Sequence, residues 1–432
     1  MQRRPNPERQ PPAVRLKEDL GMIQETRIYQ LITPLFGGGV HASENDLALL
    51  IRGTSIRGQL RFWWRACFGD SSAADPLADK RQREAALLAD MRRREAALWG
   101  SASDGKTGAP SLVQVMVEIL NAGQEFRATT PNGVPVRVSA PNSPFGYAAF
   151  PLQDKPAATV REGIEFKLTI SYPARIGDRN TEKEVQDTVW AWEVFGGIGG
   201  RTRRGFGALR CGVINGQPTR AEPHSPASIQ SRLREIMPNP QQWPKDVPHL
   251  HPEMKLRVVQ PARPPREMWA ELLKKLKNFR QERNPGRERN RPGRSRWPEA
   301  DALRRITGER ARLHFEDITK VDAFPRAAFG LPIIFHFKDS GDPDATLQVE
   351  GHERFASPLI LKPLGSSAGA VGLVAKLCGS TLDDKQLTVK TRRTNKNVRI
   401  GTAAELRPLT RSDGQALLSG ESDPIDAFLA QF

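Results

Sequence analysis

The chain has 432 residues, which is enough for two domains that each bury a core. Its 65 Lys and Arg outnumber its 49 Asp and Glu, and the formal net charge of +16 favours an anionic partner, either nucleic acid or an anionic membrane. No stretch approaches the roughly 20 apolar residues of a membrane span, and the N-terminus lacks the apolar core of a signal peptide, so we expect a soluble, cytoplasmic protein. The three cysteines lie far apart and form no C-x-x-C pair, so the sequence predicts no metal site and no cofactor.

The first predicted elements are a tail, a strand and a glycine run. Residues 1–20 are rich in Pro, Arg and Gln, which predicts a disordered basic tail. Residues 24–35 alternate apolar and polar side chains, as a half-buried strand does, and Gly37 to Gly39 then end the strand. A glycine run lets the backbone approach a ligand closely, although a plain flexible turn explains it equally well.

Within residues 51–69 the sequence predicts a helix from about Ile56 to Phe68 with two different faces. Thr54 or Ser55 can cap its N-terminus, and Gly69 suits the left-handed residue that often ends a helix. One face is an apolar stripe, made of Ile56, Leu60, Trp63 and Cys67. The other face carries cations and aromatic rings, namely Arg57, Arg61, Arg65, Trp64 and Phe68.

The cationic face favours an anion-binding site. Arg57, Arg61 and Arg65 follow one another at i, i+4 and repel, and no Asp or Glu lies between Ile51 and Phe68 to relieve the repulsion. An anionic partner would relieve it. The alternative is a solvated basic face whose carboxylates come from elsewhere in the fold.

The following segments complete one domain. Residues 71–100 are rich in Ala, Leu, Arg and Glu, which predicts a surface helix or helical pair without a functional site. Residues 112–120 predict a buried strand, residues 162–172 a second strand with alternation, and residues 181–195 a helix that Gly196 ends. The order strand, helix, strand, strand, helix, strand is the ferredoxin-like arrangement, an antiparallel sheet backed by two helices.

A glycine-rich loop, residues 196–210, separates that second helix from the last strand. Arg201, Arg203 and Arg204 crowd together among glycines, so backbone N–H groups and guanidinium forks could converge on one phosphate. The loop matches neither the nucleotide P-loop nor G-x-G-x-x-G. It matches half of the RNA-recognition-motif signature, but Ala and Cys stand where aromatic rings would stack bases. The alternative is a glycine-rich hairpin with solvated arginines.

The rest of the chain predicts a connection, an insertion and a second sheet. Residues 216–262 are dense in Pro and polar residues, which predicts a linker. Residues 263–311 predict a basic insertion that either orders on RNA or stays solvated. From about Arg312 apolar and polar side chains alternate again. This pattern predicts three strands of one second sheet, at residues 330–337, 357–364 and 385–391.

Several motifs resemble those of the RAMP superfamily, the RNA-binding subunits of CRISPR effector complexes. They are TPLFGGG (Thr33 to Gly39), IRGTSIRGQLRFWWRA (Ile51 to Ala66), GGIGGRTRRGFGAL (Gly196 to Leu209), AFGLPI (Ala328 to Ile333) and RFASPLILK (Arg354 to Lys362). Within the superfamily they look like the first subunit of the type III-B, or Cmr, complexes. The resemblance implies an α+β fold of two ferredoxin-like (RRM-like) RAMP domains, residues 21–215 and 312–432, with helical and basic insertions.

The resemblance and the charge pattern together give a candidate RNA-binding set. Its members lie at the first helix, in the glycine-rich loop and before two C-terminal strands: Arg52, Thr54, Ser55, Arg57, Arg61, Arg65, Gly197, Gly199, Gly200, Arg201, Arg203, Arg204, Phe206, Arg326 and Arg354. The resemblance implies a non-catalytic subunit that acts in antiviral defence. It would hold guide crRNA, target single-stranded RNA or both near the guide 3′ end, beside other RAMP subunits.

Two other functions stay open at this point. Some RAMP proteins cleave guide precursors without a metal, using a histidine base, and His41 is the only candidate near the motifs. A metal-independent endoribonuclease is therefore the alternative. Binding to an anionic membrane is disfavoured, because the basic stretches lack a long amphipathic apolar face.

Overall fold

The computed structural model describes residues 21–39, 44–73, 75, 77–102, 108–155, 158–219, 224–286, 293–311, 314, 316–337 and 339–432. The predicted basic tail and His41 lie outside the described residues, as does a central part of the predicted basic insertion, residues 287–292.

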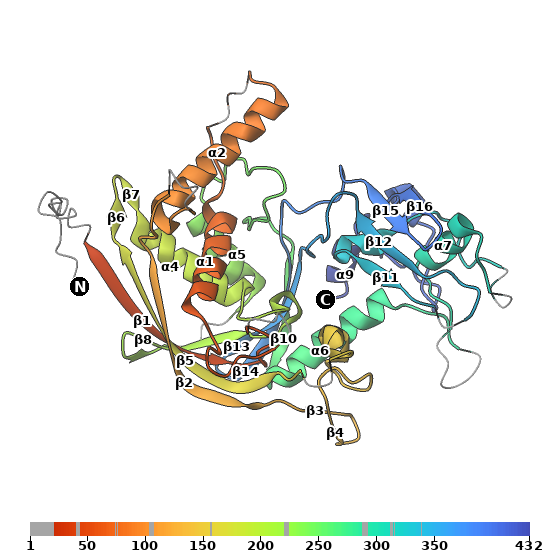
Figure 1. Cartoon of the computed structure of the whole chain (residues 1–432), viewed down its shortest axis with the longest axis horizontal. Helices are drawn as coiled ribbons and strands as arrows, with labels where there is room; N and C mark the ends of the chain where they lie inside the picture. Colours follow the sequence, from red (N-terminus) through yellow and green to blue (C-terminus); the bar gives the residue numbers. More distant parts are fainter. Residues whose placement is uncertain are drawn as a thin grey trace, which may run out of the picture.

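An antiparallel sheet with two helices on one face forms the N-terminal module, residues 21–219 (Figure 1). Over the described residues the strand order is β2-β5-β1-β8-β9, from β1 (Met22–Leu31), β2 (Gln114–Glu125), β5 (Arg161–Pro173), β8 (Leu209–Ile214) and β9 (Gln217–Pro218). The helices are α1 (Gly53–Phe68) and α4 (Thr181–Phe195). This order and connectivity confirm the predicted ferredoxin-like fold and the predicted helix at 181–195.

The core of this module lies between the sheet and the two helices. On β1, alternate side chains such as Tyr29 and Leu31 are buried, as the alternating pattern predicts. The Tyr29 ring stacks on Phe166 of β5 at 5.3 Å and meets the edge of Trp192 of α4 at 5.5 Å. The apolar pattern of the sequence therefore places α4 against the strands.

Strand β2 differs from its prediction as a buried strand. It is an edge strand that pairs only with β5, and Met116 is 65% exposed. Only Val115 and Val117 among its apolar residues pack against the core. Its run of apolar residues concealed the alternation typical of a strand with one solvated face.

Helix α1 begins earlier than the predicted Ile56 and ends at the predicted Phe68, but neither end has the predicted cap. It starts at Gly53 with Arg52 at the N-cap, whose side chain makes no capping hydrogen bond, so the predicted caps Thr54 and Ser55 lie inside the first turn. Gly69 has φ −79° and is not left-handed. A Cβ on Gly69 would lie 2.4 Å from the Arg65 carbonyl oxygen, which explains the glycine by close packing.

The apolar stripe of α1 is confirmed, but the division into two faces is not. Ile56, Leu60, Trp63 and Cys67 are all buried. Trp64, predicted on the cationic face, is also fully buried, and its indole N–H donates to Glu184 Oε2 at 2.9 Å. Helix α2 (Lys80–Trp99) forms the predicted helical insertion and projects from the module (Figure 1).

The C-terminal module, residues 224–432, is built on a second antiparallel sheet, here called the core sheet. Over the described residues its order is β10-β14-β13, from β10 (Leu256–Arg263), β13 (Leu359–Ser366) and β14 (Gly369–Lys376). Helices α6 (Pro265–Arg280) and α9 (Pro424–Leu429) pack on it. The order β10, α6, β13, β14, α9 is the ferredoxin-like series up to its second helix.

Two predictions for this region are wrong. The predicted linker 216–262 contains α5 (Pro226–Ile236) and most of β10, which both contribute to the core. The predicted basic insertion 263–311 begins with α6, whose Trp269 and Leu272 are fully buried. In both segments the prolines and charges masked a short apolar periodicity, which packing against the sheet is enough to stabilise.

A further set of strands forms the inserted sheet, which has its own core (Figure 1). Its order is β11-β12-β15-β16, from β11 (Ile333–Phe335), β12 (Ala345–Val349), β15 (Leu387–Lys390) and β16 (Asn395–Val398), and α7 (Glu299–Thr307) packs beside it. The predicted single second sheet is therefore wrong, because its three predicted strands are divided between the core sheet and the inserted sheet.

The remaining described elements are short. They are β3 (Ala128–Thr129), β4 (Pro135–Val136), α3 (Gly146–Ala149), η1 (Phe150–Leu152), β6 (Arg175–Ile176), β7 (Arg179–Asn180), η2 (Thr202–Arg204), η4 (Pro325–Phe329) and α8 (Ala403–Leu406).

The two modules share their cores. One face of the core sheet, with Ile360 and Leu373, belongs to the same apolar cluster as α1 and α4. The other face, with Leu361 and Val374, packs with α6. The modules are therefore held together by buried apolar side chains of β13 and β14.

A buried lysine marks the contact between the modules. Lys362 of β13 is fully buried, and its Nζ donates to the carbonyl oxygens of Glu193 at 2.8 Å and Gly196 at 2.7 Å, where α4 ends. Burial lowers the pKa of Lys362 to about 7, although the nearby Glu193 carboxylate opposes the shift. The folded state therefore holds this proton less tightly than the unfolded chain does.

We predict that the stability of the protein rises from about pH 7 to about pH 9, because in that window the unfolded chain binds the Lys362 proton and the folded chain releases it. Urea unfolding at several pH values measures the rise. Lys362→Met should reduce it, whereas Lys376→Met should keep it, since ion pairs with Asp423 and Asp426 help raise the pKa of Lys376. An equal rise in Lys362→Met and the wild type would contradict the assignment.

Candidate functional site

A pocket beside helix α1 is the place where the three N-terminal motifs meet. It has a volume of about 460 Å³ and is called here the α1 pocket. It is lined by Gly38, Leu50, Ile51, Arg52, Ser55, Gly58, Gln59, Phe62, Ile198 and Gly199. The fold therefore brings the predicted site residues Arg52, Ser55 and Gly199 together with the glycine run.

The side chains of Arg52 and of the first turn of α1 carry polar groups that have few hydrogen-bond partners among the described residues. Among the described residues, the Arg52 guanidinium makes only a long contact of 3.5 Å with the Gly39 carbonyl oxygen, and its buried Nε has no acceptor. Thr54 and Ser55 are exposed at the start of the helix. These groups are free to bind a ligand.

The cationic face of α1 is partly neutralised by helix α2. Glu95 is buried, and its Oε1 accepts from Arg61 Nε at 2.9 Å and from Arg65 NH1 at 2.8 Å. For these two arginines the carboxylate does come from elsewhere in the fold, which was the alternative to an anionic partner. Two guanidiniums nevertheless share one carboxylate, and each side chain remains about one third exposed.

Arg57 adds to this surplus of positive charge. It is half-buried and makes no hydrogen bond or ion pair with any residue that the structure describes. The row Arg57, Arg61 and Arg65 thus carries three positive charges against the single charge of Glu95.

The predicted phosphate cradle in the glycine-rich loop is not formed. Arg201 Nε donates to the Ala148 carbonyl oxygen at 2.8 Å, and Arg203 donates to that of Ser357. Arg204 donates to the carbonyl oxygens of Leu359 at 2.8 Å and Phe329 at 3.3 Å. The three guanidiniums are directed at different backbone groups, mostly of the C-terminal module, and do not converge on one anion site.

Burial of these arginines agrees with a structural role. It lowers the pKa of Arg201 and of Arg203, and it lowers the pKa of Arg204 to about 9 with a contribution from the positive charge of Arg280. The Arg204 guanidinium still carries its charge at neutral pH. The alternative of solvated arginines is wrong as well, because all three side chains donate to backbone carbonyl oxygens, and those of Arg203 and Arg204 join the two modules.

The glycines of this loop are explained by close packing. Gly205 has φ +85°, and a Cβ there would lie 2.5 Å from Trp269 Nε1 of α6. A Cβ on Gly199 would lie 2.5 Å from the Phe36 carbonyl oxygen, and Gly197 and Gly200 also approach other atoms closely. Phe206, predicted to contact RNA, is fully buried against Phe36 and Trp269, so that prediction is wrong.

The two C-terminal candidates are not part of the α1 pocket. Arg326 forms an ion pair with the buried Glu299 at 3.1 Å and donates to the Arg280 carbonyl oxygen at 3.2 Å, so it supports the fold. Arg354 is exposed and has no partner within the described part of the chain.

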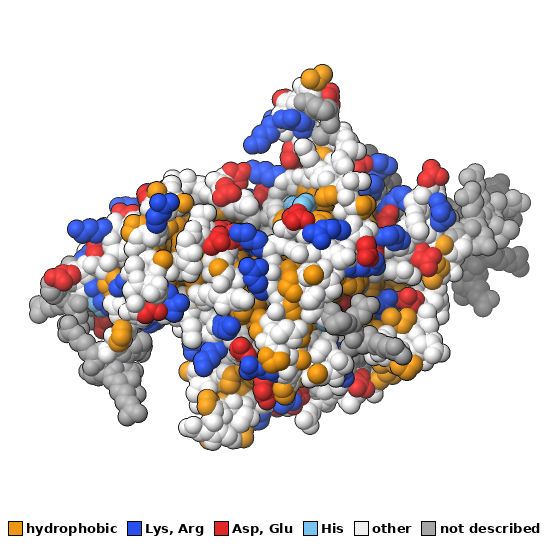
Figure 2. Space-filling view, turned by 180° about the vertical axis from the view of Figure 1, so that it is seen from behind, with side chains coloured by type: hydrophobic (Ala, Val, Ile, Leu, Met, Phe, Trp, Pro, Cys, Tyr) orange, Lys and Arg blue, Asp and Glu red, His pale blue; other side chains and the backbone are white. Residues whose placement is uncertain are grey.

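The overall positive charge does not form one continuous surface on the face shown in Figure 2. There, Lys and Arg side chains lie among Asp and Glu side chains and apolar patches (Figure 2). In the part of the chain that the structure describes, no helix is long and apolar enough to cross a membrane.

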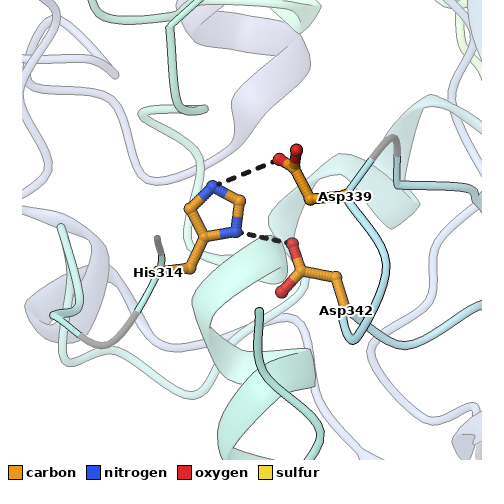
Figure 3. Close-up of side chains that lie close together, drawn as sticks. All are labelled: His314, Asp339 and Asp342. Atoms are coloured by element: carbon orange, nitrogen blue, oxygen red, sulfur yellow. Dashed lines mark hydrogen bonds and ion pairs between the residues drawn. The ribbon is translucent and has the colours of Figure 1, made fainter. Parts of the chain in front are cut away.

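One cluster of possible metal ligands lies in the C-terminal module (Figure 3). His314 Nδ1 is 2.7 Å from Asp342 Oδ2, and His314 Nε2 is 3.6 Å from Asp339 Oδ2. Arg304 also contacts the Asp342 carboxylate. Its NH2 lies 2.7 Å from Asp342 Oδ2 and 3.2 Å from His314 Nδ1. A cation in this cluster would meet the Arg304 charge, so the cluster is explained as part of a buried ion-pair network.

Sequence reasoning missed several residues of the site, among them Gln59, Phe62 and Glu95. Gln59 and Phe62 line the α1 pocket, and Glu95 holds two of the arginines. The signal for Glu95 was present, because it stands at an inward position of α2, four residues after the buried Met91. A carboxylate in an apolar stripe needs a buried cationic partner.

We predict that Arg204→Ala lowers the free energy of unfolding by about 1–3 kcal/mol, because it leaves the carbonyl oxygens of Leu359 and Phe329 without a donor. Arg354→Ala removes the same charge from an exposed position and should change it by less than about 0.5 kcal/mol. Urea unfolding of both variants measures the difference. Equal stability of the two variants would show that Arg204 does not join the modules.

Comparison with known proteins finds one family model and several solved structures that are similar to this chain. The model of the RAMP superfamily matches residues 28–210. The structure is similar to that of Cmr1 from Pyrococcus furiosus, with a TM-score of 0.48, 17% identity, and coverage of 83% of this chain and 89% of that chain. It is also similar to chains in two structures of the Type III-B Cmr-beta complex bound to cognate target RNA, each with 12% identity. Their TM-scores are 0.43 and 0.44, and the matches cover 82% and 94% of this chain and 94% and 99% of those chains.

Among curated proteins, none matches the sequence. The match to the RAMP superfamily covers residues 28–210, which make up most of the N-terminal module.

Proposed function

We propose that this chain is a non-catalytic RNA-binding subunit of a type III-B CRISPR effector complex. It would hold guide crRNA, target single-stranded RNA or both near the guide 3′ end, beside other RAMP subunits. The RAMP superfamily match and the motifs at residues 33–39, 51–66 and 196–209 support this class. The observation that carries RNA binding is the row of cations on α1, where the Glu95 carboxylate pairs with Arg61 and Arg65 and Arg57 has no ion-pair partner among the described residues.

The geometry of this row suits a polyanion. Four residues of an α-helix rise by about 6 Å, so Arg57, Arg61 and Arg65 repeat along one side of α1. Arg61 uses only Nε and Arg65 only NH1 on Glu95, which leaves their other N–H groups to donate. Guanidinium groups bind phosphate oxygens through charge-assisted hydrogen bonds, and such contacts carry no base preference of their own.

The α1 pocket offers no acid–base pair for cleavage. Within the described part of the chain, its lining contains no His, Asp, Glu, Lys, Cys or Tyr. General acid–base cleavage needs such a group within hydrogen-bond reach of the reacting atoms. This supports binding without catalysis, while His41 lies outside the described residues and keeps the endoribonuclease alternative testable.

We predict that replacing Arg57, Arg61 and Arg65 with Ala weakens binding to unrelated single-stranded RNA sequences alike. Each phosphate contact contributes about 0.7 to the slope of log K against log salt, so the slope should flatten by up to about 2. Binding titrations at several salt concentrations measure it.

A matched control removes three exposed cations of the C-terminal module, Lys320, Arg392 and Arg407. None of them lines the α1 pocket. Should both triple variants flatten the slope equally, non-specific charge would explain RNA binding and the assignment to α1 would fail.

We also predict that the full chain alone leaves labelled single-stranded RNA intact, both with a chelator and with magnesium. Denaturing gels of timed samples measure this. A specific product that disappears in His41→Ala would replace the binding proposal with the endoribonuclease.

A further inference from the structure

A third face of α1 points to a more specific ligand than a phosphate chain. Ser55, Gly58, Gln59 and Phe62 follow the helical spacing i, i+3, i+4, i+7, and all four line the α1 pocket. Around the helix, this face lies between the cationic row and the buried stripe. One helix thus presents a row of cations next to a largely uncharged hollow.

The pocket has the chemistry of a site for a flat, uncharged group with polar edges. Leu50, Ile51 and Ile198 supply apolar walls, and Phe62 supplies a half-buried ring. Gln59 offers one acceptor and two donor hydrogens, and its side chain has no partner among the described residues. The volume of about 460 Å³ lies within the range of roughly 300–1,000 Å³ that is usual for small-ligand pockets.

The Phe62 ring is held in place by its neighbours. It meets the Trp63 ring edge-on at 5.0 Å, and the Arg203 guanidinium lies 5.7 Å from its centroid. Arg203 is itself bonded to the Ser357 carbonyl oxygen of the C-terminal module. The position of the ring therefore depends on the contact between the two modules.

We propose that the α1 pocket takes one unpaired nucleobase of the bound RNA, with Phe62 as the stacking surface and Gln59 as the hydrogen-bonding group. This inference rests on the proposed RNA binding and adds the base to it. The cationic row would hold the adjacent phosphates while the base leaves the strand for the pocket. Stacking on an aromatic side chain is the usual way in which proteins bind an unpaired base.

Gly58 allows the pocket to be filled without disturbing the protein. It is exposed, and a Cβ at this position would meet no atom within 4 Å. Both Ala and Leu favour a helix more than Gly does. Gly58→Leu would therefore occupy the pocket, whereas Gly58→Ala would leave most of it open.

The test compares a short single-stranded RNA with a strand of the same length whose nucleotides are all replaced by abasic tetrahydrofuran units. The full chain should bind the base-bearing strand about tenfold more tightly, within the range that stacking of one base provides. Gly58→Ala should keep this preference. Gly58→Leu should bind both strands alike, with the affinity that the wild type has for the abasic strand, and melting curves verify that both variants are folded.

Two other outcomes distinguish a failure of the pocket proposal from a failure of the proposed RNA binding. If the wild type binds both strands tightly and equally, or if Gly58→Leu keeps the preference for bases, the pocket proposal is overturned and RNA binding stands. If the wild type binds neither strand, the proposed function fails and the pocket proposal fails with it.

Discussion

Helix α1 has three faces in different environments: the apolar core, the surface that carries the arginine row, and the α1 pocket. The rest of the N-terminal module depends on how the residues of α1 are divided among them. Ile56, Leu60 and Trp63 enter the core that the sheet and α4 complete. The arginine row is kept beside this core by Glu95 of α2, which offsets part of the like-charge repulsion. Without that buried carboxylate, two half-buried guanidiniums would face one another beside an apolar core.

The glycine-rich loop has a role that its composition does not suggest. Arg203 and Arg204 donate to backbone carbonyl oxygens of the C-terminal module, and the glycines of the loop let it approach α6 and the chain near Phe36. Lys362 adds a second polar contact at the end of α4. The loop therefore joins the modules and, through Arg203 and Phe62, connects that joint to the α1 pocket.

The sequence predicted those parts of the fold in which local periodicity and packing agree. The helix at 181–195 and the buried stripe of α1 follow from apolar spacing. The ferredoxin-like fold of the first module was predicted from the order of its elements together with the resemblance to the RAMP superfamily. The core sheet could not be predicted, because β10 is separated from its partner strand β14 by about a hundred residues and lies in a segment whose prolines resemble a linker. Local patterns do not contain such long-range pairings.

The candidate site was predictable only in part, for a related reason. Arg57, Arg61 and Arg65 are recognisable from their spacing, but whether an arginine is free or bonded depends on groups distant in sequence. Glu95 lies 30 residues from Arg65, and the carbonyl oxygens that bind Arg204 lie more than 100 residues away. Residue type predicted cations at the motifs, and the fold determined which of them remain available.

Ultraviolet crosslinking of single-stranded RNA to the full chain, followed by mass spectrometry of the crosslinked peptides, tests the central claim most directly. The account predicts crosslinked nucleotides on peptides of α1 that include Phe62, with loss of these crosslinks when Arg57, Arg61 and Arg65 are replaced by Ala. Crosslinks confined to the C-terminal module, with α1 unmodified, would contradict it.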